Sequence, residues 1–126
     1  MSGCLLAGFM TLALSGPDFR LEWMHSVEHV AWREEWLIKD GMLDLQRAAV
    51  QGSGAGMEPG QDAVLSDGWW VWTPDLPPQR ELLLGASGAT EGGWRICDVA
   101  TCREIGRAAS RAIRLRPCPD QSNSAG

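Results

Sequence analysis

Residues 19–27 read FRLEWMHSV, in which Phe19, Leu21 and Trp23 alternate with polar side chains. A period of two is typical of a β-strand with one buried face, because successive side chains of a strand point to opposite faces. After residues 28–29 the apolar positions change from odd to even numbers, which indicates a bulge or a tight turn. The segment is therefore predicted to be extended and half-buried.

Turn signals and short apolar runs continue this pattern along the chain. Asp40-Gly41 and Asp67-Gly68 are dipeptides that favour two-residue hairpin turns. The strand-like runs after the first of these turns lie at residues 43–50, 63–65, 69–72, 81–84, 94–96 and 103–105. This pattern predicts a mainly β protein that forms either a small antiparallel barrel or a sandwich.

Two segments of the chain also have apolar residues at the spacing of a helix. Residues 22–39 are rich in helix formers, so a helix is the alternative to strands in that part of the chain. Near the end of the chain a short helix is preferred, because the apolar residues form one narrow stripe that Pro117 ends. The stripe consists of Ile105, Ala108, Ala109, Ala112 and Ile113.

The composition indicates one globular domain. The chain has 126 residues, of which 44% are hydrophobic and 21% are charged. A net charge of -5 disfavours nucleic acid as a partner. Residues 95–126 are nevertheless basic, so proximity to an anionic membrane surface is one interpretation of this region, and a solvated face is the other.

The first residues have the features of a secretory signal. The apolar stretch Cys4–Leu14 has the length of the apolar region of a signal peptide. Ala13 and Ser15 are small residues three and one positions before a possible signal-peptidase cleavage site ahead of Gly16. A buried first strand or an uncleaved anchor is the alternative. The expected organisation is therefore a signal peptide or apolar segment at 1–15, a β-rich domain at 16–106 and a basic, partly helical and then disordered tail at 107–126.

Two of the four cysteines are spaced for a disulfide. Cys97 and Cys102 flank four residues between two strand-like runs, so a hairpin would place them opposite each other. A structural zinc site would need four ligands, and no second pair is spaced for it. Cys118 lies between two prolines and is expected to be an exposed thiol, and lipidation of Cys4 is not expected.

Residues 25–29 read HSVEH, which fits the H-x-x-E-H signature of some zinc peptidases. That chemistry needs both imidazoles on one helical face, with a third ligand such as Glu104. On a strand His25 and His29 would lie about 13 Å apart at 3.3 Å per residue. A zinc-dependent hydrolase is therefore an alternative function, and no metal ligand is predicted.

A polar binding pocket is the preferred interpretation of the same segment. The glycine-rich stretch at 52–57 permits positive φ angles and close backbone approach, so its amides could bind an anion. A tight sheet corner is the alternative for these glycines. The candidate binding residues are His25, Ser26, Glu28, Gly52, Gly54, Gly56 and Met57.

A carbohydrate-binding module is a further alternative. It would use Trp69, Trp70 and Trp72, and alternation is expected to put Trp70 on the face opposite the other two. Because rings on opposite faces cannot stack on one sugar chain, this alternative is the weaker one.

Several short motifs together resemble a known bacterial family. They are His25-Ser26-Val27-Glu28, Trp32, Glu34-Glu35, Gly-Ser-Gly-Ala-Gly-Met at 52–57, Ala-Val-Leu at 63–65, Asp67-Gly68-Trp69 and the late cysteine pair. In this order they resemble the uncharacterised domain-of-unknown-function family 1850 (DUF1850), over about residues 19–105.

Members of that family are typically short, have an N-terminal apolar segment and are often encoded beside TRAP-type transporters of the TAXI subfamily. The resemblance implies an exported accessory to solute uptake, with TRAP-transporter components as partners. It implies a location in the periplasm or at the inner membrane, with the cytoplasm as the alternative. A non-enzymatic role is favoured over an enzymatic one, and no cofactor is implied.

Overall fold

The computed structural model describes residues 3–25, 30–51, 63–84, 90–105 and 112–119. The strands in this part of the chain are β1 (Gly3–Ala7), β2 (Met10–Leu14), β3 (Asp18–His25), β4 (Ala31–Lys39), β5 (Met42–Gln51), β6 (Val64–Ser66), β7 (Trp69–Trp72), β8 (Leu82–Leu84), β9 (Thr90–Cys97), β10 (Cys102–Ile105) and β11 (Ile113–Pro117). The prediction of a mainly β protein is confirmed.

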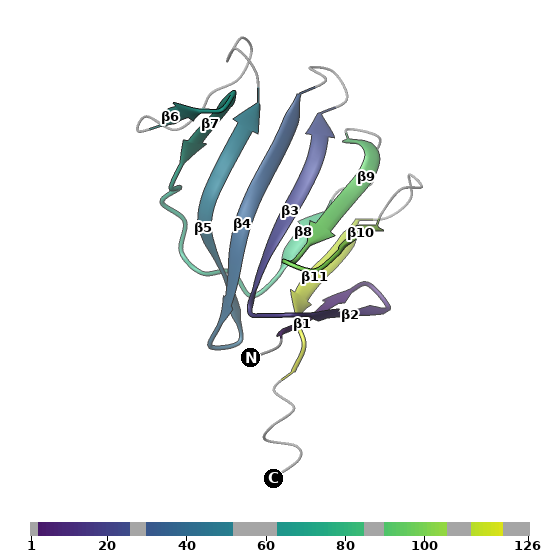
Figure 1. Ribbon diagram of the computed structural model, residues 1–126. Coiled ribbons are helices and arrows are strands. Elements are labelled where there is room, and N and C mark those ends of the chain that lie inside the picture. The colour runs from purple at the N-terminus through teal and green to yellow at the C-terminus, as the bar shows by residue number, and fades with distance from the viewer. Residues whose placement is uncertain (1–2, 26–29, 52–62, 85–89, 106–111, 120–126) are drawn as a thin grey trace.

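The strands form two antiparallel sheets. The larger sheet has seven strands in the order β10-β9-β3-β4-β5-β7-β6, and the smaller has four in the order β2-β1-β11-β8. Figure 1 shows the long strands β5, β4, β3 and β9 side by side, with the β1–β2 hairpin at the end where β3 begins. The two sheets do not join into a closed barrel, so the barrel prediction is wrong.

Pleat alternation and turn chemistry explain the centre of the larger sheet. Phe19 lies opposite Trp36 and Trp23 opposite Trp32, so the apolar positions of β3 and β4 share one face. Asp40 and Gly41 have φ angles of 55° and 74°, which a two-residue turn requires at both central positions. The second predicted turn, between β6 and β7, has the same geometry.

The predicted C-terminal helix is absent from the described residues. Ile105 ends β10 and Ile113 begins β11, while residues 106–111 lie outside the described part. β11 is a strand because it fills the gap between β1 and β8, where Leu115 becomes completely buried. A stripe of helical spacing therefore contained residues from two different strands. The described residues contain no helix of the length and apolar character that crossing a membrane would require.

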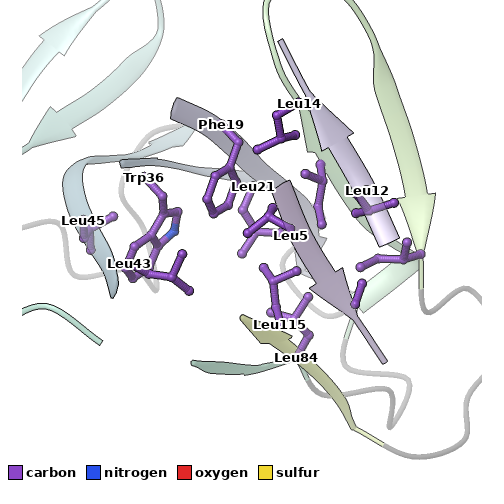
Figure 2. Close-up of a cluster of buried hydrophobic side chains, with 13 residues drawn as sticks. Leu5, Leu12, Leu14, Phe19, Leu21, Trp36, Leu43, Leu45, Leu84 and Leu115 are labelled. Carbon is purple, nitrogen blue, oxygen red and sulfur yellow. The ribbon is translucent and has the colours of Figure 1, made fainter. Parts of the chain in front are cut away.

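One core lies between the two sheets (Figure 2). The smaller sheet contributes Leu5, Ala7, Leu12, Leu14, Leu84 and Leu115, and the larger sheet contributes Phe19, Leu21, Trp36, Leu43, Leu45, Ile96 and Ile105. The apolar N-terminal segment thus forms β1 and β2 and supplies part of this core. Cleavage of residues 1–15 stays a prediction, and it would remove Leu5, Ala7, Leu12 and Leu14 from this core.

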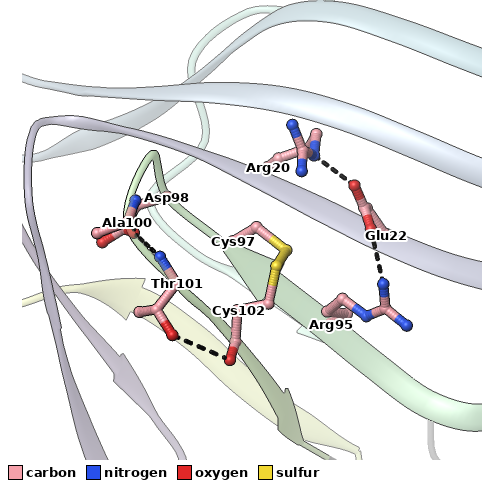
Figure 3. The surroundings of a disulfide bond; sticks show 8 residues. All are labelled: Arg20, Glu22, Arg95, Cys97, Asp98, Ala100, Thr101 and Cys102. Atoms are coloured by element: carbon pink, nitrogen blue, oxygen red, sulfur yellow. Dashed lines mark hydrogen bonds and ion pairs between the residues drawn. A yellow bond between two sulfur atoms is a disulfide. The ribbon is translucent and has the colours of Figure 1, made fainter.

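Two disulfides connect the strands. The predicted bond between Cys97 and Cys102 joins β9 to β10 across a Cα–Cα distance of 4.0 Å (Figure 3). Cys118 is bonded to Cys4, with 5.4 Å between the Cα atoms, so the expectation of an exposed thiol is wrong. The second bond was not predicted because its cysteines are 114 residues apart, and only the pairing of β1 with β11 brings them together.

Asp98 holds the β9–β10 loop against the residue that follows β2. Its carboxylate accepts hydrogen bonds from the backbone amides of Ser15, Thr101 and Ala100, at 2.8 to 2.9 Å. These donors lower the pKa of Asp98 to about 2, because they stabilise the ionised carboxylate. The disulfide hairpin is therefore connected by a charged side chain to the N-terminal segment.

Candidate functional site

Of the predicted binding residues, His25 is the one within the described chain. Its backbone ends β3 opposite Thr90. Ser26, Glu28 and the predicted glycines with Met57 lie outside the described residues. β3 ends and β4 begins at the same end of the sheet, and β5 also ends there at Gln51. The strands that precede residues 25–29 and the glycine-rich stretch at 52–57 therefore end at the same end of the sheet. The pocket between these two segments stays a prediction.

The hydrolase alternative depends on the same region. β3 is extended as far as His25, whereas Glu28 and His29 lie outside the described residues. Within the described residues, no group of three or more His, Cys, Asp or Glu side chains could hold a metal ion. Zinc binding by residues 25–29 is left untested by this geometry.

The face of the larger sheet that carries Phe19 and Leu21, which we call the inner face, continues beyond the core as a tryptophan cluster. This cluster consists of Trp23, Trp32, Trp72 and Trp94. Trp23 stacks on Trp32 with 6.0 Å between ring centroids, and Trp94 lies 4.9 Å from Trp23. Trp72 meets Trp32 edge-on at 6.4 Å. Trp23 and Trp94 also pack against the core, so the cluster extends the core toward the end of the sheet where β3 stops.

Glu34 is an acidic residue on this inner face. It lies opposite Leu21 on β3 and accepts a 3.0 Å hydrogen bond from the indole Nε1 of Trp36. Burial raises the pKa of Glu34, and the hydrogen bond from Trp36 opposes part of that rise. The sequence analysis named Glu34 only as part of the family motif and did not predict its burial. The available signal was an acid at an even position between Trp32 and Trp36, where the alternation calls for an apolar side chain.

The Glu34→Gln variant is expected to be more stable than the wild type at neutral pH. The folded protein keeps the proton of Glu34 to a higher pH than the unfolded chain does, for which the ordinary pKa is 4.5. Wild-type stability therefore falls as the pH rises from 4.5 through the raised pKa, and glutamine removes this loss. Thermal unfolding at about pH 4 and about pH 7 measures the effect, with the gain expected only at the higher pH.

The neighbouring Glu35→Gln variant is the matched control. Glu35 lies on the opposite face, half-exposed and paired with Arg47 at 3.9 Å, so its neutralisation brings no relief from burial. An equal gain in both variants at neutral pH would contradict the assignment of the raised pKa to burial of Glu34.

The other face of the larger sheet, which we call the outer face, carries a different constellation. Trp69 on β7 lies there together with Arg33, whose guanidinium carbon is 4.4 Å from the centroid of the Trp69 ring. This distance is that of a cation–π contact, which holds the guanidinium group over the ring. The Nε atom of Arg33 is buried and has no hydrogen-bond partner. Arg33 is thus held in place with one donor unused.

Two cavities flank Trp69. The smaller has a volume of about 330 Å³, and its lining includes Glu22 and Trp69 together with three rings of the tryptophan cluster, Trp23, Trp32 and Trp94. The larger has a volume of about 770 Å³, and its charged lining consists of Arg33, Arg47, Glu35 and Asp67. Val64, Ser66, Trp69 and Val71 also line it. Both volumes lie in the range of small-molecule sites. We call this pair of cavities the outer-face site, after Trp69, the outer-face residue that lines both of them.

Charged pairs surround the outer-face site. Glu22 bridges Arg20 on its own strand and Arg95 on β9, the latter at 3.6 Å (Figure 3). Arg47 lies 3.9 Å from Glu35, at the outer limit of an ion pair. The sequence analysis did not predict these residues as a site. Their signal was weak, because charged side chains on the polar positions of a strand usually indicate only a solvated face.

The carbohydrate alternative required three neighbouring tryptophans on β7. Trp70 pairs with Val50 and Trp72 with Ala48, so both belong to the inner face. Trp69 belongs to the outer face, so the expectation that Trp70 lies opposite the other two is wrong. Side chains two residues apart on a strand point to the same face, so strict alternation puts Trp70 with Trp72 and Trp69 opposite both of them. The three rings cannot form one platform for a sugar chain.

Comparisons with known proteins give one match. A family model described as "Domain of unknown function (DUF1850)" matches residues 19–105. The matched region contains all the side chains named for the outer-face site, and it leaves out β1, β2 and β11. No curated protein and no solved structure matches the chain.

Proposed function

The chain belongs to the DUF1850 family, and we propose that it is a non-enzymatic, exported binding module that serves as an accessory to TRAP-type solute uptake. The observation that carries the proposal is the outer-face site, in which two cavities share the wall formed by Trp69. A preformed hollow on a rigid sheet, with an aromatic wall and convergent charged groups, is the usual form of a small-molecule site.

The two disulfides support export. Disulfides form and persist in oxidising compartments such as the bacterial periplasm, and they are rare in the cytosol. Each bond joins neighbouring strands, one within the larger sheet and one between β1 and the end of β11. A fold that uses all four of its cysteines in this way is suited to the compartment where TRAP-type transporters meet their solutes.

The chemistry of the outer-face site supports binding over reaction. Glu22 is engaged by the guanidinium groups of Arg20 and Arg95, and so acts as a bridge between β3 and β9. Arg33 lies against the ring of Trp69. These contacts position charge and an aromatic surface, which are the means of recognising a solute or a partner protein.

Co-purification tests the accessory role. The full chain is co-expressed with the membrane subunit of a TRAP transporter from the same organism, and retention of the subunit on the tagged chain is measured. We expect the Trp69→Ala variant to lose most of the retained subunit, because it removes the shared wall of both cavities. The matched control is Phe9→Ala, since Phe9 is fully exposed at the β1–β2 turn of the other sheet.

Retention by the wild type and by Phe9→Ala, but not by Trp69→Ala, would support the proposal. Absence of retention by the wild type, or equal retention by all three chains, would overturn it. Circular dichroism of the purified Trp69→Ala variant checks that it is folded, so that a loss of the retained subunit is not caused by unfolding.

A further inference from the structure

We infer that the larger cavity of the outer-face site binds a small organic carboxylate, with its charged group between Arg33 and Arg47. This inference deepens the proposed function and rests on it. The apolar part of the ligand would lie against Trp69 and Val71, which line the same cavity.

Arg33 has the features of a ligand-binding guanidinium group. The ring of Trp69 lies 4.4 Å from its guanidinium carbon, and this cation–π contact holds the group in place. Its Nε atom is buried without a hydrogen-bond partner, and because Arg33 lines the cavity, a ligand would meet the terminal nitrogens of the guanidinium group. A carboxylate supplies two oxygens in one plane, which matches the planar fork of the guanidinium group.

Arg47 provides the second positive charge. Arg33 lies opposite Ala49 in the register of β4 and β5, and Arg47 is two residues from Ala49 on the same face. Arg33 and Arg47 therefore lie on one face of neighbouring strands, and both line the larger cavity. Arg47 is more than half exposed and lies 3.9 Å from Glu35, so it can turn toward a ligand at small cost.

The lining of the cavity favours an organic anion over an inorganic one. Val64 is 65% exposed, and an apolar ligand that covers it would remove this side chain from water. The volume of about 770 Å³ far exceeds the size of a phosphate or sulfate ion. Ser66 adds a hydroxyl group to the same lining, which also contains the carboxylates of Glu35 and Asp67. The ligand would therefore be held by direct contact with the two guanidinium groups, and not by a net positive charge of the cavity. An acid with a short aliphatic or aromatic body fits these features together.

Matched probe pairs test the inference on the full-length protein. Hexanoate and 4-phenylbutyrate are compared with hexanamide and 4-phenylbutanamide, and sulfate serves as an inorganic anion. Binding is measured by calorimetry and by the shift of the Trp69 indole signal in NMR spectra. We expect at least one carboxylate to bind about tenfold more tightly than its amide, because the amide lacks the charge that strengthens hydrogen bonds to arginine.

Three arginine variants locate the site. Arg33→Gln and Arg47→Gln are each expected to weaken carboxylate binding about tenfold, whereas Arg116→Gln is expected to leave it unchanged. Arg116 is exposed on β11 in the other sheet and gives the same change in net charge. Arg47→Gln keeps the test decisive if Arg33→Gln fails to fold, because Arg47 is largely solvated.

Each remaining outcome contradicts the inference. Equal affinity for acid and amide, equal affinity for sulfate, unchanged binding by both pocket variants, or no binding of either carboxylate would overturn it. These failures are distinguishable from failure of the accessory role, because the transporter subunit could still be retained by a chain that binds no carboxylate.

Discussion

A chain that begins at Gly16 is expected to lose cooperative thermal unfolding. The truncation removes β1 and β2, and with them Leu5, Leu12 and Leu14, which are 0%, 2% and 6% exposed. Deleting most of one buried leucine side chain typically costs about 2–5 kcal/mol, while whole domains are stable by only about 5–15 kcal/mol. The loss of three such side chains therefore exceeds what a domain of this size can tolerate.

Two point variants in the same hairpin show whether the loss of stability comes from its buried side chains. Leu12→Ala is expected to remain folded with a stability lower by about 3 kcal/mol. Phe9→Ala lies between the same two strands and is expected to unfold at the wild-type temperature, because Phe9 is fully exposed. Calorimetry and near-UV circular dichroism measure the series. A chain starting at Gly16 that unfolds cooperatively at the wild-type temperature would contradict the role of β1 and β2, and would favour their removal as a signal peptide.

The double variant Cys4→Ser/Cys118→Ser is expected to lose about 4 kcal/mol of stability. This bond joins residues that are 114 positions apart, so it restricts the unfolded chain over nearly its whole length. In the chain-entropy model, a disulfide that closes a loop of about 100 residues stabilises the folded protein by about 4.7 kcal/mol, because it removes conformational entropy from the unfolded chain. The bond also holds β1 beside β11, at the junction of the two ends of the described fold.

The second disulfide provides the internal comparison. Cys97 and Cys102 are five positions apart, so their bond restricts few conformations of the unfolded chain. Their double serine variant is expected to lose about 2 kcal/mol. Urea unfolding of both variants and of the wild type gives the two differences. A larger loss for the short loop than for the long one would contradict the chain-entropy explanation.

Part of the candidate site could be seen in the sequence and part could not. The alternation of apolar residues correctly placed Trp23 on the apolar face of one strand and Trp32 on the apolar face of the next. The contact between the two rings then follows from the register of β3 and β4. The contact of Arg33 with Trp69 could not be predicted, because it crosses from β4 over β5 to β7. No local pattern states that β7 joins the sheet beside β5.

The same distinction separates what sequence and tertiary structure contributed to the fold. Extended strands, the Asp40-Gly41 turn and the Cys97–Cys102 bond follow from pleat alternation and turn geometry, which act over a few neighbouring residues. The order of the strands, the Cys4–Cys118 bond and the strand at Ile113–Pro117 arise only when two sheets bury their apolar faces together. Hydrophobic burial has no direction and is indifferent to distance along the chain, so many partners satisfy it equally until the whole core is assembled.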